Sequence, residues 1–426
     1  MKNKCKEILR NPYNILWIIA IYTLVFGLIS DSIPNIITGF IKIISIRGML
    51  ITDYIAVGGV GATLLNVSLS CALILTIYRK VQLKATGSLI MAFWLCFGFS
   101  FFGKNVFNMM PIIFGGYLYS RYKKEDFMWY TLTSVLSTSL APAVNEFYYI
   151  GVFKAPVLNF IFAIVIGICI GFIMIPISIN AMKAHSGFNL YNVGFAAGIL
   201  GLLIMGIIRG LGLDQVEQQI YWSDDKTILM ATYIIIICLF LITMGLFMAK
   251  DPRLHLKKIY KSSGRLVSDY YLAHKESVYI NMGLLGLFVT ILVILLGGDI
   301  NGPTLGGIFT VIGFGCFGKH LKNVFPVMTG AILAGFLCQW EVSSPNIILA
   351  IIFSAGLAPI AGTFSTKIWK IPFNDGIIAG MLHIFVVTNV GTVHGGLNLY
   401  NNGFAAGFVA MILVPIITNF REGDFN

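Results

Sequence analysis

Two fourteen-residue blocks carry the polar side chains best suited to chemistry in this sequence. Residues 185–198 read HSGFNLYNVGFAAG and residues 394–407 read HGGLNLYNNGFAAG, so eleven of the fourteen positions are identical. Asparagine amides and tyrosine hydroxyls donate and accept hydrogen bonds without carrying charge, which suits the binding of a small polar solute. The blocks predict the lining residues Asn189, Tyr191, Asn192, Asn398, Tyr400 and Asn401.

Each block begins with a histidine, His185 in the first and His394 in the second. Histidine can sense protons near neutral pH, so this pair could gate the site. A histidine at the end of an apolar segment more often caps or borders that segment, and this interpretation stays open. The Gly-x3-Gly spacing inside each block predicts close approach of two backbones. A tight helix crossing with a polar cap is therefore the alternative to a solute site.

A second repeated block places a lysine beside a break between two short apolar segments. Both copies read Gly-Lys-x3-Asn-x2-Pro, one beginning at Gly103 and the other at Gly318. A lysine there must snorkel, pair or face an aqueous cavity, because a bare charge in hydrocarbon is costly. A helix that starts after the lysine would add positive potential. The alternative is that the two lysines are ordinary cationic ends of membrane helices at opposite faces, which would give the same pattern. The residues that we expect to attract an anion are Lys104, Asn108, Lys319 and Asn323.

The elements that must position these residues are membrane segments. The 426-residue chain is 57% hydrophobic and 11% charged, against roughly 25% charge in soluble domains. We expect an all-α polytopic membrane protein with several short or broken helices. Its predicted segments, about fourteen in number, lie near 14–33, 54–78, 85–102, 105–119, 127–142, 156–180, 189–209, 227–249, 277–297, 303–317, 323–338, 346–361, 374–391 and 398–420.

The repeated blocks recur in the same order, which predicts an internal duplication. A third pair, Leu-Ala-Pro at 140–142 and 357–359, lies at a similar offset. Basic residues cluster in alternate short loops and the connection at 214–225 is acidic, so the positive-inside rule predicts two inverted repeats of seven segments with both termini in the cytoplasm. The expected parts are a first membrane repeat at 1–210, an extracellular connection at 211–226, and a second repeat at 227–426 with a cytoplasmic loop at 251–276. The stretch 34–47 is open to two interpretations, an interfacial helix or a re-entrant segment.

The remaining chemistry-bearing residues give weaker signals. No nucleotide-binding loop, metalloprotease helix or serine-hydrolase elbow is present, so we expect no enzyme, no cofactor and no metal. No carboxylate is repeated cleanly, and Glu146 and Asp53 are the best candidates for coupling a cation. The seven cysteines are scattered without metal-ligand spacing and are expected in the core: Cys5, Cys71, Cys96, Cys169, Cys238, Cys316 and Cys338.

The two asparagine-rich blocks carry the resemblances of this chain. The sequence resembles a family of internally duplicated multi-pass membrane proteins of Firmicute-type bacteria, of unknown function, and that resemblance implies no activity. It is more distantly similar to urea transporters, whose repeats carry an aromatic-Asn-Gly stretch before a small-residue helix, as at 190–198 and 399–407. Membrane subunits of flavin-bearing redox pumps attach flavin through a Ser/Thr-Gly-Ala-Thr stretch. Val60–Thr63 is similar to it but lacks the first hydroxyl.

These features predict a secondary transporter or channel that moves a small polar solute across the cell membrane. An anion is preferred because the repeated ionisable residues are lysines and histidines. A urea-like neutral solute is the alternative, followed by a flavin-bearing redox subunit and a scaffold without transport. The expected partners are the solute, the lipid bilayer and a second copy of the chain. The net charge of +11 lies in short loops and does not indicate nucleic acid.

Overall fold

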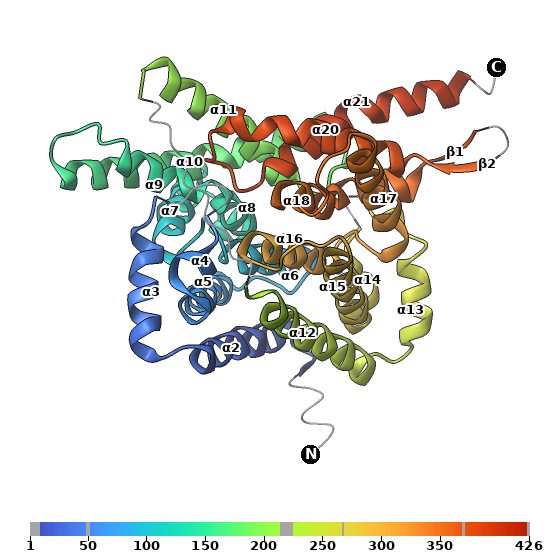
Figure 1. Ribbon diagram of the computed structural model, residues 1–426, viewed down its shortest axis with the longest axis horizontal. Coiled ribbons are helices and arrows are strands. Elements are labelled where there is room, and N and C mark those ends of the chain that lie inside the picture. Colours follow the sequence, from blue (N-terminus) through green and yellow to red (C-terminus); the bar gives the residue numbers. More distant parts are fainter. Residues whose placement is uncertain (1–8, 48–51, 214–224, 266–267, 369–370, 424–426) are drawn as a thin grey trace.

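The computed structural model describes residues 9–47, 52–213, 225–265, 268–368 and 371–423, and these residues are almost all helical (Figure 1). The first half contains α2 (Pro12–Ser30), α3 (Ile33–Ser45), α4 (Tyr54–Gly58), α5 (Val60–Lys80), α6 (Gly87–Phe99), α7 (Val106–Lys123), η1 (Phe127–Trp129), α8 (Thr131–Ser137), η2 (Thr138–Leu140), α9 (Ala141–Tyr149), α10 (Pro156–Ala184) and α11 (Asn192–Gly210).

The second half repeats this order of elements. It contains α12 (Thr227–Met248), α13 (Pro252–Ile259), α14 (Tyr270–His274), η3 (Lys275–Ser277), α15 (Val278–Leu295), α16 (Gly302–Phe314), α17 (Leu321–Leu337), α18 (Pro345–Ser354), η4 (Ala355–Leu357), α19 (Ala358–Thr363), α20 (Gly376–His394) and α21 (Asn401–Gly423). A short antiparallel hairpin, β1 (Ser365–Ile368) and β2 (Ile371–Asn374), joins α19 to α20 and was not predicted.

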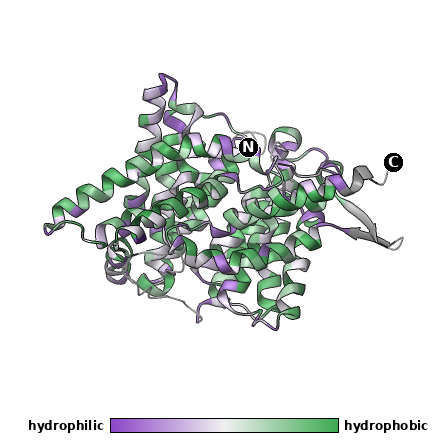
Figure 2. Cartoon of the chain, turned by 90° about the horizontal axis from the view of Figure 1, so that it is seen from above, coloured by the Kyte–Doolittle hydropathy of each residue, from purple (hydrophilic) through white to green (hydrophobic). Residues whose placement is uncertain are grey.

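The helices are those of a polytopic membrane protein, as predicted. Each predicted apolar segment overlaps one or more helices, and within the described residues nine helical stretches are long and apolar enough to cross a membrane. The outward face of α10 carries large apolar residues such as Val157, Phe160 and Ile161, each more than half exposed. Figure 2 shows hydrophobic residues along most of the length of the helices. This outer surface suits hydrocarbon contact.

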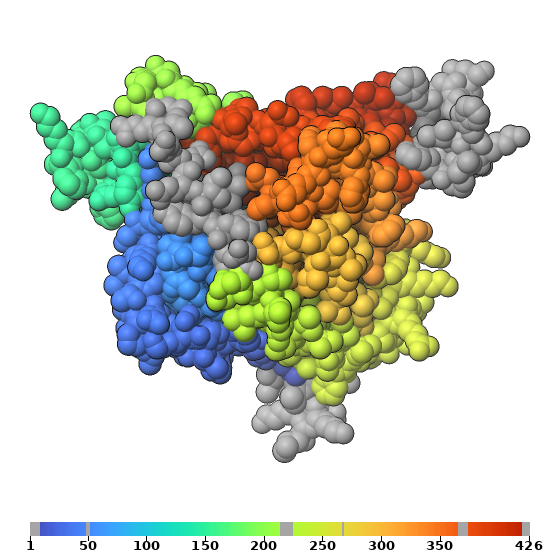
Figure 3. All heavy atoms as spheres, in the orientation of Figure 1, coloured from blue at the N-terminus to red at the C-terminus, as the bar shows by residue number. Residues whose placement is uncertain are grey.

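The two halves are built from equivalent packing units. In the first half α2 packs on α5 and α7 on α10, and in the second half α12 packs on α15 and α17 on α20. The halves meet where α6 packs on α16 and where α11 packs on α21. Figure 3 shows the blue residues of the first half and the orange residues of the second half together on one face.

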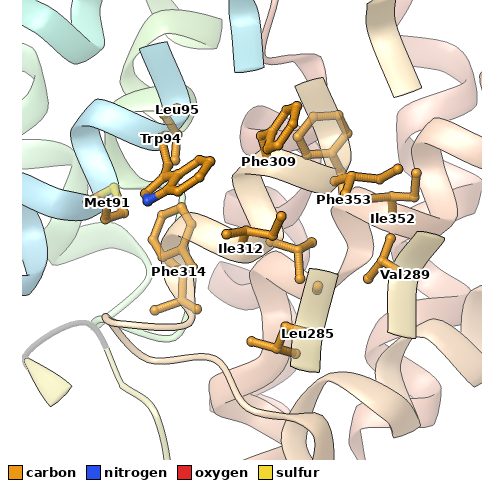
Figure 4. Close-up of a cluster of buried hydrophobic side chains, with 14 of the residues drawn as sticks. Met91, Trp94, Leu95, Leu285, Val289, Phe309, Ile312, Phe314, Ile352 and Phe353 are labelled. Atoms are coloured by element: carbon orange, nitrogen blue, oxygen red, sulfur yellow. The ribbon is translucent and has the colours of Figure 1, made fainter. Parts of the chain in front are cut away.

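The hydrophobic core lies at the contact between the halves. Trp94 and Phe97 of α6 pack against Phe309 of α16, with ring centroids 5.6 and 4.7 Å apart. Figure 4 shows Trp94 in one cluster with second-half residues such as Phe309, Ile312 and Phe314. Because the core is shared, neither half buries its apolar surface without the other.

Helices α3 and α13 are equivalent in position but differ in character. They lie on opposite edges of the molecule (Figure 1). Helix α3 covers most of the stretch 34–47, and its Ile33, Ile37 and Ile41 are exposed. Helix α13 instead carries Arg253, Lys257 and Lys258. The two helices therefore hold equivalent positions, but α3 exposes apolar side chains and α13 exposes basic ones.

The prediction that the cysteines lie in the core is partly wrong. Cys71, Cys96, Cys238 and Cys316 are buried, but Cys169 and Cys338 are exposed on α10 and at the end of α17. Both lie in apolar stretches whose outer faces would meet lipid, so local hydrophobicity did not separate the two environments. Cys5 and most of the predicted extracellular connection lie outside the described residues.

Candidate functional site

Three breaks in helical structure from each half converge at the contact between the halves. The first is the junction between α6 and α7, matched by the junction between α16 and α17. The second is the 3-10 turn η2, matched by η4. The third is the segment that precedes α11, residues 185–191, matched by residues 394–400 before α21. Polar backbone is thus concentrated at the centre of an apolar molecule, where it needs partners or lines a cavity.

The lysine junctions have the same local construction in both halves. Gly103 and Gly318 adopt positive φ angles of 65° and 103°, a region that glycine enters without strain. Asn66 of α5 donates to the carbonyls of Ser100 and Lys104 at 2.8 and 2.9 Å. Its counterpart Asn281 of α15 makes the equivalent two bonds to Gly315 and Lys319, at 2.7 and 2.8 Å.

The predicted ligand residues Asn108 and Asn323 serve these junctions. The Asn108 amide accepts from the backbone N–H of Asn105 at 2.9 Å and donates to the carbonyl of Gly103 at 3.1 Å. Asn323 makes the same two bonds to His320 and Gly318, both at 2.9 Å. Both ends of each amide are engaged by the loop backbone, so we leave these residues out of the proposed lining. The first turns of α7 and α17 are likewise closed by their own capping boxes.

The segments before α11 and α21 cross to the opposite half. The backbone N–H of Leu190 donates to the carbonyl of Gly356 in η4 at 3.0 Å, and that of Leu399 donates to Ser139 in η2 at 3.1 Å. In each segment the first asparagine of the block, Asn189 or Asn398, accepts from the N–H two residues later at 2.9 Å. These turns aim the following tyrosine into the contact between the halves.

The structure brings the two asparagine-rich blocks together. The Asn189 amide donates to the carbonyl of Gly403 at 3.1 Å, and the rings of Tyr191 and Tyr400 lie 4.8 Å apart. Glycine makes this approach achievable, because a Cβ on Gly194 would lie 1.8 Å from the Tyr400 ring. Asn192 and Asn401 begin the two helices that follow. The binding role of these residues stays a prediction.

The two histidines hold the asparagines that follow them by seven residues. His185 Nε2 lies 3.0 Å from the Asn192 amide oxygen, and His394 Nδ1 lies 2.7 Å from that of Asn401. His394 Nε2 also lies 2.9 Å from the carbonyl of Gly198, across the contact between the halves. Both rings are buried. These contacts give the histidines a positioning role, and gating stays a prediction.

The two lysines are both fully buried, but their side chains meet different surroundings. The Lys319 ammonium donates to the hydroxyl of Tyr191, and it lies 4.4 and 4.8 Å from the ring centroids of Tyr191 and Phe314. Lys104 lies 5.5 Å from the centroid of Phe99 and lines a cavity. In the part of the chain that the structure describes, no carboxylate forms an ion pair with either lysine.

The cavity beside Lys104 has a volume of about 160 Å³. It is lined by Met91, Leu95, Phe99, Lys104, Leu136, Ser139, Leu190, Tyr191, Asn192, Val193, Gly194, Phe314, Phe317 and Tyr400. Of the predicted site residues, it collects Lys104, Tyr191, Asn192 and Tyr400. Ser139 was missed, although it directly precedes the repeated Leu-Ala-Pro block. Its counterpart is Gly356, so comparison of the two repeats could not indicate a functional side chain there.

The carboxylates considered for cation coupling have structural partners. Glu146 of α9 accepts from Arg47 Nε and Nη2 at 2.8 and 2.5 Å. Asp53 accepts from the N–H of Gly302 at the start of α16, at 3.0 Å, while Asp269 accepts from the N–H of Gly87 at the start of α6, at 2.9 Å. Asp53 and Asp269 are therefore a repeated pair that crosses between the halves, and the statement that no carboxylate is repeated is wrong. The pair was missed because, of its immediate neighbours, only the following tyrosine, Tyr54 or Tyr270, is identical.

Residues able to hold a cofactor or metal are few. Thr63, considered for flavin attachment, is buried and donates from its hydroxyl to the carbonyl of Gly59 at 2.7 Å. It lies in the first turn of α5. Among the described residues, no group of three histidine, cysteine, aspartate or glutamate side chains could hold a metal ion.

The fold and the central breaks define a class of duplicated, membrane-embedded helical proteins. The chain belongs to the family described as "Protein of unknown function (DUF1576)", whose model matches residues 32–210 and 250–419. The first matched region covers α3 to α11 and the second runs from α13 into α21, so that α2, α12 and the connection before α12 are unmatched. No curated protein and no solved structure matches the chain.

Proposed function

We propose that this protein is a transporter or channel that moves a small polar solute through the site between its two halves, and that it is not an enzyme. The observation that carries the proposal is the convergence of six helix breaks from both halves around two buried lysines and a cavity. Broken helices at a repeat interface place backbone dipoles and polar side chains at mid-membrane depth, where a solute must be held.

The two halves are proposed to be inverted in the membrane. The connection between α5 and α6 carries Lys80 and Lys84, whereas the equivalent connection between α15 and α16 carries Asp299 and no basic residue. The basic α13 likewise matches the apolar α3. Equivalent loops with opposite charge character are expected when the halves face opposite sides, because basic loops stay in the cytoplasm. On this topology both termini are cytoplasmic and the cell membrane is the location.

Thiol labelling tests the topology. Lys84→Cys and Asp299→Cys would each be made in a chain whose exposed Cys169 and Cys338 are replaced by serine. In intact cells a membrane-impermeant maleimide should label position 299 and spare position 84 until the cells are opened. Labelling of both positions from the same side would contradict inversion.

Solute flux tests the transport proposal. The purified full chain would be placed in proteoliposomes and challenged with small anions, neutral amides such as urea, and small cations. Uptake above that of protein-free vesicles is expected for at least one class. Absence of flux for all classes would favour a scaffold, and yellow protein with bound flavin would favour the redox alternative.

A further inference from the structure

We infer that the cavity beside Lys104 binds one small monovalent anion, such as a short carboxylate or an inorganic oxyanion. This inference rests on the proposed function and names the solute class that the central site would hold. It draws on four features of the cavity: a buried cation, an open helix N-terminus, a buried hydroxyl and the size and charge of the lining.

The buried cation is the ammonium of Lys104, whose side chain is 1% exposed. Among the described residues it has no carboxylate partner, and its ammonium lies 5.5 Å from the centroid of the Phe99 ring. A desolvated charge without a counter-charge is costly, and a cation–π contact recovers only part of that cost. A bound anion would supply the missing counter-charge.

The N-terminus of α11 opens into the same cavity. Asn192, Val193 and Gly194 form the first turn of this 19-residue helix, and all three line the cavity. The first N–H groups of a helix have no partner within the helix, and here the side chain of the N-cap residue, Tyr191, does not cap them. They present the positive end of the helix dipole beside Lys104. By contrast, α7, which follows Lys104 in the chain, is capped by Asn105.

A hydroxyl completes the donor set. Ser139 lines the cavity and is 4% exposed, and its Oγ has no hydrogen-bond partner among the described residues. Buried hydroxyls are normally paired, so a lone one beside an ammonium marks a donor position for a ligand. A serine hydroxyl can donate to an anion through its rotatable hydrogen.

The remaining lining sets the size and charge of the ligand. A volume of about 160 Å³ corresponds to roughly five water molecules at about 30 Å³ each, and so to a solute of about four to six non-hydrogen atoms. Among the described residues that line the cavity none is acidic, and Lys104 alone is charged. A monovalent anion matches that single positive charge, whereas a cation would meet an ammonium and a helix N-terminus.

Equilibrium binding tests the anion separately from transport. The full chain in detergent would be titrated at constant ionic strength with acetate, formate and nitrate, and with the neutral isosteres acetamide and formamide, following protein fluorescence and thermal unfolding. The anions should bind and raise the unfolding temperature, while the amides should bind at least tenfold more weakly. Acetamide binding as tight as acetate would overturn the inference.

Variants assign the binding to this cavity. Lys104→Gln should weaken acetate binding by at least about tenfold, and Ser139→Ala by about three- to tenfold, as expected for charge-assisted contacts. The matched control is Ser277→Ala, which removes another buried hydroxyl that has no hydrogen-bond partner among the described residues and lies outside the lining; it should retain binding within about threefold. Equal losses in the two serine variants would overturn the assignment. If Lys104→Gln does not fold, unchanged acetate affinity in Ser139→Ala would do so.

Failure of the inference is distinguishable from failure of the proposed function. Flux of a neutral solute without anion binding would overturn the anion site and leave the transport proposal standing. Lys104-dependent anion binding without flux of any solute would retain the site and overturn transport.

Discussion

Lys104 and Lys319 occupy equivalent positions in the two halves, yet one lines a cavity and the other is held by a tyrosine. Their loops share a positive-φ glycine, a bridging asparagine from α5 or α15, and an asparagine that closes the next helix. The difference begins beyond the backbone, at the ends of the side chains. The duplication has kept a symmetrical scaffold and let the site at its centre become asymmetric.

A single residue difference accounts for much of this asymmetry. Gly356 of η4 lies under the Tyr191 ring, and a Cβ there would lie 2.4 Å from two of its carbons. The missing side chain admits the ring, whose hydroxyl then reaches Lys319. The equivalent position in η2 is Ser139, which lines the cavity together with Lys104 and Tyr400. The Tyr400 hydroxyl makes no hydrogen bond with the described residues.

The largest effect is expected from a substitution that breaks the contact between the two halves. Gly194→Ala would place a methyl group 1.8 Å from the Tyr400 ring, and the required backbone shift should cost more than about 3 kcal/mol of stability. Gly206→Ala on the same helix has nothing within 4 Å and should be neutral or stabilising by up to about 1 kcal/mol. Thermal unfolding in detergent measures both. Similar unfolding temperatures would contradict the close crossing of α11 and α21.

The next largest effect is expected from exchanging the residue types at positions 139 and 356, where the two halves differ. Gly356→Ser should push the Tyr191 ring away from Lys319 and destabilise the protein by roughly 1–3 kcal/mol, as overpacking does. Ser139→Gly should have little effect on stability but should let the Tyr400 ring move toward Lys104 and shrink the cavity. Thermal unfolding and acetate titration check the two changes. Equal destabilisation by both would show that this position does not cause the asymmetry.

A smaller effect distinguishes the two tyrosine hydroxyls. Tyr191→Phe removes the hydrogen-bond partner of the buried Lys319 ammonium and should cost about 1–2 kcal/mol, since the charge is left unsatisfied. Tyr400→Phe removes a hydroxyl without a hydrogen-bond partner among the described residues and should change stability by less than about 0.5 kcal/mol. Denaturant or thermal unfolding measures the difference. Equal losses would mean that both tyrosines serve their lysines alike.

The smallest effect should be the same in both halves. Asp53→Ala and Asp269→Ala each remove a carboxylate that accepts an N–H at the start of the helix in the opposite half. Each should cost about 1 kcal/mol, the typical value of a helix cap. Asp126→Ala, which removes the exposed cap of η1, is the control and should cost less. A large inequality between Asp53 and Asp269 would weaken the assignment of equivalent roles.

Local sequence was sufficient to predict the helices and the duplication. Apolar runs bounded by charge and by Gly or Pro predicted segments that overlap the helices of both halves, because membrane helices satisfy their own backbone and need little tertiary help. The repeated blocks also indicated which segments are equivalent. The same local view misplaced Cys169 and Cys338 and missed the Asp53–Asp269 pair, since burial has no local signature and a repeated Asp-Tyr dipeptide is too short to stand out.

The composition of the site was decided by tertiary structure. The repeats were sufficient to name polar residues as candidates for binding a solute. They did not show that the loop backbone would engage the side-chain amides of Asn108 and Asn323. Tyr191 meets Lys319 across 128 residues of chain, and Ser139 joins Lys104 only where two breaks pack together. Repetition in sequence predicts equal environments. Packing made the two environments unequal. Gly356 in η4 leaves room for the Tyr191 ring, whereas Ser139 in η2 borders a cavity.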